Sequence, residues 1–223
     1  MPTAKTSRNQ QPSPKRPARS ILPANVVPAG TPGRILVTAL RLFARAGFHG
    51  TSVRDLAAQC TLQPGALYVH FPSKEHILAE LARLGHEAHQ DALRAALLQA
   101  GDDPCDQLRA VVHTNATQHA TYPQLAVVVN EELFALPAQL AAPALALRKQ
   151  SSALLLDILQ RGVDTGRFSC ANLLVTAAAI GAMSLRIPYW YEPRSGLAIA
   201  TLAEQQAELA LRMVGCIPLE RKA

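Results

Sequence analysis

The fold is decided by residues 42–78, which read "LFARAGFHGTSVRDLAAQCTLQPGALYVHFPSKEHIL". Ser52 and Asp55 are spaced as in a capping box, and they predict the start of a short helix. Pro64 suits the first position of another helix, because no N–H donor is needed there. Two short helices joined by a tight turn are typical of a helix-turn-helix (here about residues 54–73), whose second helix enters the major groove of DNA.

Amphipathic helices are predicted on both sides of this motif. In "RILVTALRLFARAG" at 34–47, apolar residues recur at helical spacing, and Gly47 is a natural stop. Ser73 caps a long amphipathic segment that runs to residue 99. We therefore expect residues 31–91 to form a DNA-binding unit of three short helices and a long connecting helix.

The remaining residues, 92–223, also follow a helical pattern, and strand-forming residues are sparse. Pro137 and Pro143 predict breaks between helices. The segment 171–187 is apolar nearly all round, so we expect it to be buried on most sides. The segment 188–196, "PYWYEPRSG", is expected to be a loop. The fold class predicted from these patterns is all-α.

Charge is divided unevenly along the chain. Up to Arg54 there are nine Lys and Arg residues and no acidic residue, although the whole chain has a net charge of only +6. A basic leading segment on a mildly acidic body indicates that one end meets a polyanion, and a solvated tail is the alternative. Residues 1–30 are rich in proline and are predicted to be a disordered basic arm.

Several kinds of site are not expected. The four cysteines (Cys60, Cys105, Cys170 and Cys216) are widely separated and are predicted to be reduced, mostly buried thiols. His86 and His89 could chelate a metal, but no carboxylate or cysteine completes a set. The histidines beyond the motif (His86, His89, His113 and His119) are therefore predicted to be solvated, with no metal and no cofactor.

An enzyme is also not expected, because the sequence has no Gly-rich phosphate loop, no GxSxG elbow and no paired-carboxylate motif. There is no apolar signal region at the N-terminus, and the apolar run 173–185 is too short to span a membrane. The expected location is the cytoplasm, with no membrane partner.

In combination, the motif residues resemble the DNA-binding domain of the TetR (tetracycline repressor) family of transcriptional regulators. The resemblance covers about residues 34–80 and rests on Phe43, Gly47, 51–57, 65–68, Phe71 and 73–75. It implies an all-α homodimer, with an N-terminal three-helix helix-turn-helix domain and a C-terminal helical domain (92–223) for ligand binding and dimerisation. It further implies a repressor that binds a palindromic operator in double-stranded DNA and is released by a small apolar effector.

Two positions depart from the family pattern. Thr61 stands where the family usually has glycine, and threonine in a left-handed turn is strained. Gln63 stands where a small N-cap, often serine, is usual. Glutamine caps poorly, yet it is long enough to reach a base edge.

The expected DNA contacts lie at the starts of the motif helices and of the long helix. Hydroxyl groups and free N–H groups at a helix start favour a phosphate, Gly65 allows close approach of the backbone, and Tyr68 and His70 can donate to phosphate oxygens. Lys74 matches a phosphate contact of the family. The predicted set is Thr51, Ser52, Arg54, Gln63, Pro64, Gly65, Tyr68, His70 and Lys74.

The effector pocket of the family lies among the middle helices of the C-terminal domain. By resemblance, the predicted lining here is Leu108, Val112, Asn115, Val128, Glu131, Phe134, Arg148 and Leu155. The "YWYEP" at 189–193 resembles a loop in family members that sense acyl-CoA thioesters, and a hydrophobic drug or aromatic effector is the rival. The last two helices, about 171–187 and 197–214, are expected at the dimer interface.

Two other classes of function remain open from the sequence. One is an all-α enzyme or carrier that uses the C-terminal pocket. The other is a helical interaction protein with a vestigial DNA-binding motif. Salt-dependent binding to the DNA upstream of the chain's own gene would argue against both.

Overall fold

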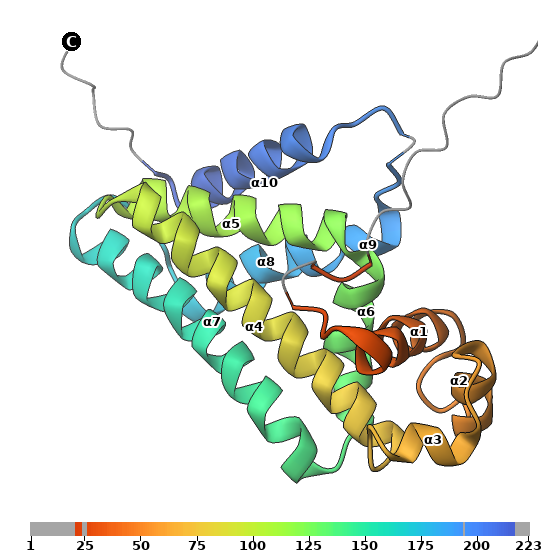
Figure 1. The fold of residues 1–223 in the computed structure, drawn as a ribbon. Coiled ribbons are helices and arrows are strands. Elements are labelled where there is room, and N and C mark those ends of the chain that lie inside the picture. Colours follow the sequence, from red (N-terminus) through yellow and green to blue (C-terminus); the bar gives the residue numbers. More distant parts are fainter. Residues whose placement is uncertain (1–20, 24–25, 194, 217–223) are drawn as a thin grey trace, which may run out of the picture.

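The computed structural model describes residues 21–23, 26–193 and 195–216. All regular elements in this part of the chain are helices, and Figure 1 shows three of them, α1 to α3, set at one end of a larger helical body. The long helix α4, Lys74–Ala100, leads from that end into the body. The all-α prediction is confirmed.

The motif helices begin and end where the local signals predict. Helix α1 spans Gly30–Ala46 and stops at Gly47, which has a φ of 74°. Helix α2, Val53–Gln59, starts with a complete capping box between Ser52 and Asp55. Helix α3, Pro64–Tyr68, has its proline in the first turn.

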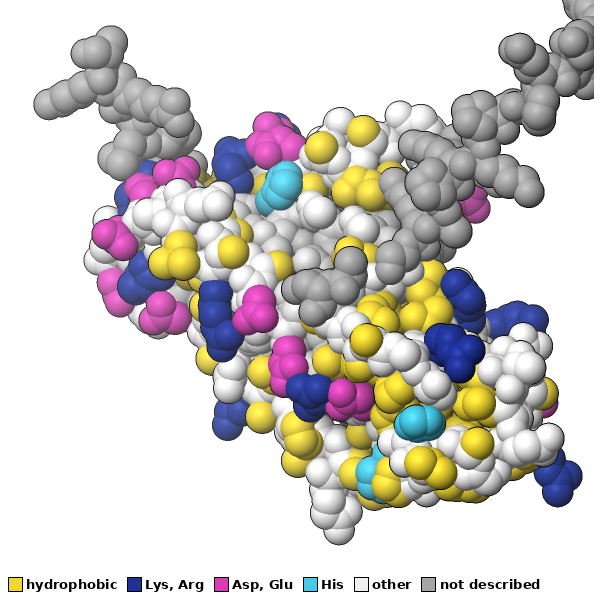
Figure 2. All heavy atoms as spheres, in the orientation of Figure 1, with side chains coloured by type: hydrophobic (Ala, Val, Ile, Leu, Met, Phe, Trp, Pro, Cys, Tyr) yellow, Lys and Arg dark blue, Asp and Glu magenta, His cyan; other side chains and the backbone are white. Residues whose placement is uncertain are grey.

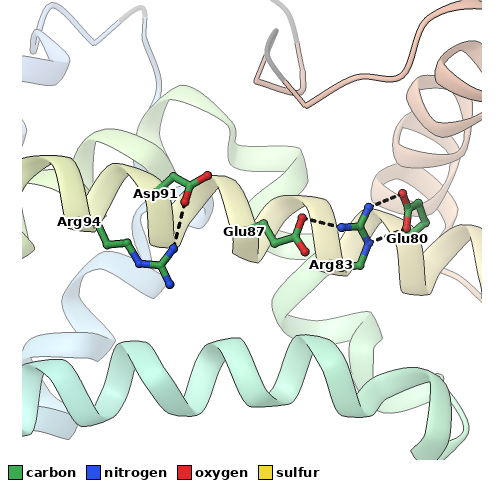
Figure 3. Close-up of polar contacts among 5 residues, drawn as sticks. All are labelled: Glu80, Arg83, Glu87, Asp91 and Arg94. Carbon is green, nitrogen blue, oxygen red and sulfur yellow. Dashed lines mark hydrogen bonds and ion pairs between the residues drawn. The ribbon is translucent and has the colours of Figure 1, made fainter.

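Helix α4 carries a row of ion pairs along its outer face (Figure 3). Arg83 donates to Glu80 at 2.7 Å and to Glu87 at 2.6 Å, and Arg94 donates to Asp91 at 3.1 Å. The hydrogen bond to Glu80 is the main cause that raises the pKa of Arg83. Pairs at this spacing each stabilise a helix by a few tenths of a kcal/mol, about 0.2–0.5, so they favour a continuous rod between the two ends of the molecule.

Among the C-terminal helices, α5, α6 and α7 pack directly against α4. Helix α5 spans Pro104–Thr121, α6 spans Pro123–Glu131, and the 3-10 turn η1 spans Glu132–Ala135. Helix α7 covers Ala138–Asp164 and runs alongside α4 in the same direction (Figure 1). Helices α8 (Leu173–Leu185), α9 (Ile187–Trp190) and α10 (Ile199–Met213) complete the body.

The N-terminal boundary differs from the prediction of a disordered arm over residues 1–30. Leu22 is completely buried in the core around α1. At Gly33 a Cβ atom would come within 2.0 Å of the carbonyl oxygen of Pro28, so the preceding segment passes directly over this glycine. Order therefore begins before α1, while residues 1–20 lie outside the described residues.

Two predictions about helix ends are wrong. Pro143 was expected to break the chain but lies inside α7. It sits in the second turn, on the exposed side, where water can satisfy the carbonyl that loses its partner. The segment 188–196 was expected to be a loop, yet its first residues form the short helix α9.

The sequence predicted that the apolar segment 171–187 is buried on most sides, and for helix α8 this prediction is wrong. Only Ile180 and Ser184 are buried in it, and Leu174 and Val175 are 69% and 67% exposed. The body of one chain is too small to cover every face of this helix. Its outward apolar face is therefore left open.

The cysteine prediction is also corrected in part. Cys105, at the start of α5, and Cys216, after the end of α10, form a disulfide with a Cα–Cα distance of 6.3 Å. Cys60 and Cys170 are free thiols. The sequence could not show this pair, because it depends on α10 packing along α5.

The buried core crosses the expected domain boundary at residues 91–92. Leu36 and Leu40 of α1 share one core cluster with Leu125 and Val128 of α6. A second cluster fills the far end, around Leu108 and Leu159. The DNA-binding unit is thus packed directly on α6 and is not an independent module.

Candidate nucleic-acid interface and ligand cavity

Helix α3 presents one exposed edge and one buried edge. Gln63, Pro64 and Gly65 are exposed at its start, Tyr68 is 51% exposed, and His70 is exposed just after its end. Leu67 on the opposite side is fully buried. The set predicted on this helix therefore lies on a single free surface. Val69, which is 80% exposed, extends that surface.

The start of α2 adds Ser52 and Arg54, which are both exposed. The hydroxyl of Ser52 accepts from the backbone N–H of Asp55 and donates to its carboxylate at 2.6 Å. The hydrogen bond from Ser52 lowers the pKa of Asp55. The hydroxyl of Ser52 is therefore engaged in capping α2, and the exposed guanidinium of Arg54 is the cation available at this helix start.

Thr51 does not lie on the exposed surface where a DNA contact was predicted. It is only 2% exposed, and its hydroxyl donates to the carbonyl oxygen of Gly47 at 2.9 Å. The capping box turns the next residue outward and leaves Thr51 facing the core. Thr51 joins the end of α1 to the start of α2.

Lys74 has two backbone partners within the chain. Its Nζ donates to the carbonyl oxygens of Phe48 and Thr51, both at 2.8 Å, and lies 4.2 Å from the centroid of the Phe48 ring. These contacts explain a lysine at a helix start, where the helix dipole disfavours a cation. One N–H of the ammonium group remains for a phosphate.

The turn between α2 and α3 has the strain that the sequence predicted. Thr61 has a φ of 56° and is the one non-glycine residue with positive φ in the described part of the chain. Gln63 makes no side-chain cap hydrogen bond to α3. Its amide is therefore free at the tip of the exposed edge.

The charge around this end is basic. Arg34, Arg41, Arg45 and Arg54 lie in α1 and α2, and Figure 2 shows Lys and Arg side chains gathered at that end, with acidic side chains mostly on the rest of the visible face. A surface with this charge and an exposed short helix is suited to the phosphates and groove of a nucleic acid.

A cavity of about 450 Å³ lies in the body between α4, α5, α6, α7 and α8. Its size is within the range of small-molecule sites, roughly 300–1,000 Å³. The apolar lining includes Leu93, Val111, Leu125, Val129, Leu155, Leu156, Leu174, Ala177 and Leu185, and the polar lining includes His86, His89, Asn115, Gln118, His119, Tyr122, Asn130, Arg148, Ser151, Ser152 and Ser184.

Three of the predicted lining residues are in this cavity, namely Asn115, Arg148 and Leu155. Five are not. Leu108, Val112 and Val128 are buried in the cores, Glu131 is exposed and accepts from the hydroxyl of Tyr189, and Phe134 is 74% exposed.

The error in α5 is one of helical phase. Val111 and Asn115 face the cavity, whereas Leu108 and Val112 face the core, and one position along a helix turns a side chain by about 100°.

Three of the histidines expected in solvent line the cavity. His86 is only 8% exposed, and His89 and His119 are partly buried with ring centroids 6.2 Å apart. Burial is the main cause that lowers the pKa of His86 and of His89 to about 4, and it also lowers the pKa of His119. The spacing of His86, His89 and Leu93 along one face of α4 is the signal in the sequence that could have placed them inside.

Three polar groups of the cavity lack the partners that burial normally requires, and one of them is the Oδ1 atom of Asn115, which makes no hydrogen bond within the described residues. The Nε2 atom of His86 is enclosed and makes no hydrogen bond within the described residues. Arg148 makes one long hydrogen bond, 3.5 Å, to the carbonyl oxygen of Asn130, and lies over the Phe134 ring at 5.9 Å. Burial lowers the pKa of Arg148.

Within the described residues, no group of three or more His, Cys, Asp or Glu side chains is placed to hold a metal. The window Leu173–Trp190, 18 residues long, is long and apolar enough to cross a membrane by composition alone. It is divided at Arg186 into α8 and α9 and belongs to the helical body.

Models of two protein families match the chain. "Bacterial regulatory proteins, tetR family" matches residues 35–81, and "Tetracyclin repressor-like, C-terminal domain" matches residues 101–214. The boundaries fit the structure, because the first covers α1 to the start of α4 and the second covers α5 to α10.

Two curated relatives illustrate the extent of the similarity. The chain is 35% identical over 92 residues to the transcriptional regulator YuxN of Bacillus subtilis, a match that covers 40% of this chain and only 31% of YuxN. It is 26% identical over 188 residues to the transcriptional repressor KstR2 of Rhodococcus jostii, covering 82% of this chain and 92% of that protein.

Solved structures agree along most of the chain. The TetR-family regulator PfmR of Thermus thermophilus has a TM-score of 0.72 and 31% identity, covering 80% of this chain and 97% of PfmR. AibR, solved with isovaleryl coenzyme A and operator DNA, has a TM-score of 0.73 over 83% of this chain and 98% of its own. Because the sequence identity is only 24%, this structural likeness shows a shared fold alone.

Proposed function

This chain belongs to the TetR family of bacterial regulatory proteins, and from that premise we propose that it is a DNA-binding transcriptional repressor whose operator affinity is controlled by a small molecule. The observation that carries the proposal is the pairing of an exposed reading helix, α3, with a cavity whose wall is packed against the same DNA-binding unit. KstR2 is named a transcriptional repressor, which supports repression over activation for this chain.

Helix α3 is proposed to enter the major groove with its N-terminus forward. Gln63 and Val69 are free to meet base edges, and Tyr68, His70 and Arg54 are placed for phosphate oxygens. Thr51 is excluded from this set because its hydroxyl is turned inward.

The ligand signal is proposed to pass through α6. Leu125 and Val129 line the cavity and also belong to the core that holds α1. A ligand that binds one position of α6 better than another therefore shifts the placement of α1 to α3. Gly85 of α4 tightens this coupling, since a Cβ there would come within 3.1 Å of Val129.

A homodimer is proposed, with α8 and α10 at its interface. Leu174 and Val175 on α8, and Leu209 and Met213 on α10, are 45–69% exposed. An apolar surface on two neighbouring helices needs a cover, and a second copy of the chain supplies a self-complementary one. The two α3 helices would then read the halves of a palindromic operator.

The effector is proposed to be an apolar molecule, with acyl-CoA thioesters as the leading class because AibR binds one. The protein is proposed to act in the cytoplasm, without catalytic activity, as is usual for regulators of this family.

The test is binding of the purified protein to a labelled fragment from upstream of its own gene, measured by fluorescence anisotropy at several salt concentrations. We expect a specific affinity at least a thousandfold above that for random DNA. Release of the fragment on addition of acyl-CoA thioesters or of an extract of apolar metabolites supports regulation. Equal, weak binding to all DNA would contradict the proposal and favour an interaction protein or a ligand carrier.

A further inference from the structure

The cavity has a polar end and an apolar end. The Nε2 amide group of Gln90 on α4 donates hydrogen bonds to the carbonyl oxygen of Leu147 at 2.9 Å and to the hydroxyl of Ser151 at 2.8 Å. These two bonds fix the register of α4 against α7. Because the two helices run in the same direction (Figure 1), His86 lies before this level on α4, Arg148 lies at it on α7, and Leu93 and Leu155 lie beyond it.

The two ends therefore differ in chemistry. The end nearer α6 contains the polar side chains of Arg148, the three histidines, Asn115 and Asn130, beside the apolar side chains of Leu125 and Val129 on α6. The other end contains Leu93, Val111 and Leu155, together with Leu174 and Ala177 from α8. A ligand that fills the cavity has to be polar at one end and apolar at the other.

The polar end carries positive charge without any compensating acid. Among the described residues, no Asp or Glu lines the cavity. Among the described residues Arg148 forms no ion pair, and its contacts are the long bond to Asn130 and the Phe134 ring. A partly buried guanidinium without a carboxylate is costly unless an anion accepts its hydrogen bonds.

A second observation points to a ligand at the same place. The Nε2 atom of His86 is enclosed without a hydrogen-bond partner, and this side chain is 92% buried, since only 8% is exposed. The charge of Arg148 acts directly on His86, so the two groups are close in space. An enclosed ring nitrogen and an unpaired cation at one end of a cavity match the needs of an oxygen-bearing head group.

We propose that the effector is an amphipathic acid, whose acyl or aryl body fills the end around Leu93, Val111 and Leu155 and whose oxyanion pairs with Arg148 beside His86. This inference rests on the proposed function and narrows its ligand class. The oxyanion is either the carboxylate of a free acid or a phosphate of a coenzyme A thioester. Neutral lipids and cationic drugs are excluded as tight ligands.

The head group is tested with four compounds of one chain length, namely decanoate, decanoyl-CoA, 1-decanol and decylamine. Binding to the full-length protein is measured by isothermal titration calorimetry. We expect decanoate or decanoyl-CoA to bind at least tenfold more tightly than decanol and decylamine. The stronger of the two acids identifies the source of the oxyanion, carboxylate or phosphate.

Arg148 is tested by substitution. Arg148→Gln should abolish the tenfold preference for the acid and leave decanol binding within about twofold, and Arg148→Lys should keep part of the preference. Lys149→Gln is the matched control, because Lys149 is the exposed neighbour on the same helix and does not line the cavity. An unchanged preference in Arg148→Gln overturns the inference, and so does equal binding of acid and alcohol, or failure of both acids to bind at millimolar concentration.

DNA anisotropy in the same samples separates this inference from the proposed function. If decanol or decylamine binds and releases the operator while the acids do not, the regulator stands and the acid head group is wrong. If the acids bind through Arg148 but the protein has no operator affinity, the binding site stands and the regulatory function is wrong.

Discussion

Lys74 donates a 2.8 Å hydrogen bond to the backbone carbonyl of Thr51 and so ties the start of α4 to the residue before the capping box of α2. A second bond, to the carbonyl of Phe48, holds the turn after α1. One ammonium group thus joins the start of the long helix to the connection between α1 and α2.

Replacing Lys74 by Ala is therefore expected to lower stability as well as DNA affinity. Two charge-assisted hydrogen bonds to buried carbonyls are lost, which should reduce the free energy of unfolding by about 1.5–3 kcal/mol. Urea unfolding followed by circular dichroism measures this loss. Lys149→Ala, at an exposed site, serves as the control. An unchanged midpoint together with a reduced salt slope for DNA binding would instead make Lys74 a phosphate contact alone.

Gln63 and Tyr68 should separate base reading from phosphate contact. Gln63→Ala is expected to relax preference at one operator position, at a cost of about 1–3 kcal/mol there, and to leave binding to random DNA unchanged. Tyr68→Phe should weaken both kinds of DNA by about 1–2 kcal/mol. Titration of operator variants at two salt concentrations measures both effects. Uniform weakening by Gln63→Ala would show that its amide does not read sequence.

The open face of α8 predicts how the dimer can be split. Val175→Glu places a charge on an apolar surface that is 67% exposed in one chain and should shift the protein to monomer at micromolar concentration. Sedimentation velocity gives the readout. Leu98→Glu is the control, since Leu98 is 86% exposed on α4, away from that face. A wild-type protein that sediments as a folded monomer would refute the dimer.

Reduction of the Cys105–Cys216 disulfide should lower stability. The bond closes a loop with a sequence separation of 111, and cross-links of about 100 residues stabilise by about 4–5 kcal/mol in the chain-entropy model. We expect a lower thermal midpoint in dithiothreitol, and no effect of dithiothreitol on Cys105→Ser. Cys170→Ser, which removes a free thiol, should respond to reductant like the wild type. A midpoint that ignores reductant would show that the two thiols are not joined in solution.

Buried neutral histidines predict acid sensitivity. His86 and His89 have pKa values lowered to about 4, below the usual 6.5, because burial disfavours their charged forms. As pH falls below 6.5, the unfolded chain binds protons that the folded chain does not. Each histidine then removes up to about 1.4 kcal/mol of stability per pH unit, until about pH 4.

His86→Gln should flatten this dependence between pH 6.5 and 4.5 in urea titrations, whereas His49→Gln, at an exposed site, should leave it as in the wild type. Equal slopes in wild type and His86→Gln would contradict the burial of this ring.

The DNA-binding unit could be predicted from sequence because its signals are local. Ser52 with Asp55, Gly47 and Pro64 each fix a helix end through atoms a few residues apart. The role of Lys74 could not be predicted in this way. Its partners lie 23 and 26 residues earlier, and they become neighbours only after the helices pack.

The sequence predicted a cavity among the middle helices of the C-terminal domain, but only some of the residues predicted to line it do so. Asn115, Arg148 and Leu155 line the cavity, and their part in ligand binding stays a prediction; periodicity alone does not show which apolar stripe of α5 faces the core. His86 and His89 were placed in solvent because a polar side chain is usually exposed, whereas here His89 packs against His119 of α5 and His86 lies close to Val129 of α6 and Arg148 of α7. Composition does not reveal that helices distant in the sequence bury these two side chains.

The double role of α6 limits how this protein can change during evolution. Leu125 and Val129 form both a wall of the cavity and a support for α1, so a substitution there that suits a new effector also disturbs the DNA-reading end. Lining residues on α5, α7 and α8, such as Val111, Ser152 and Ala177, carry no such double duty. Drift in effector preference among descendants of this chain should therefore accumulate on those three helices, while α6 stays nearly constant.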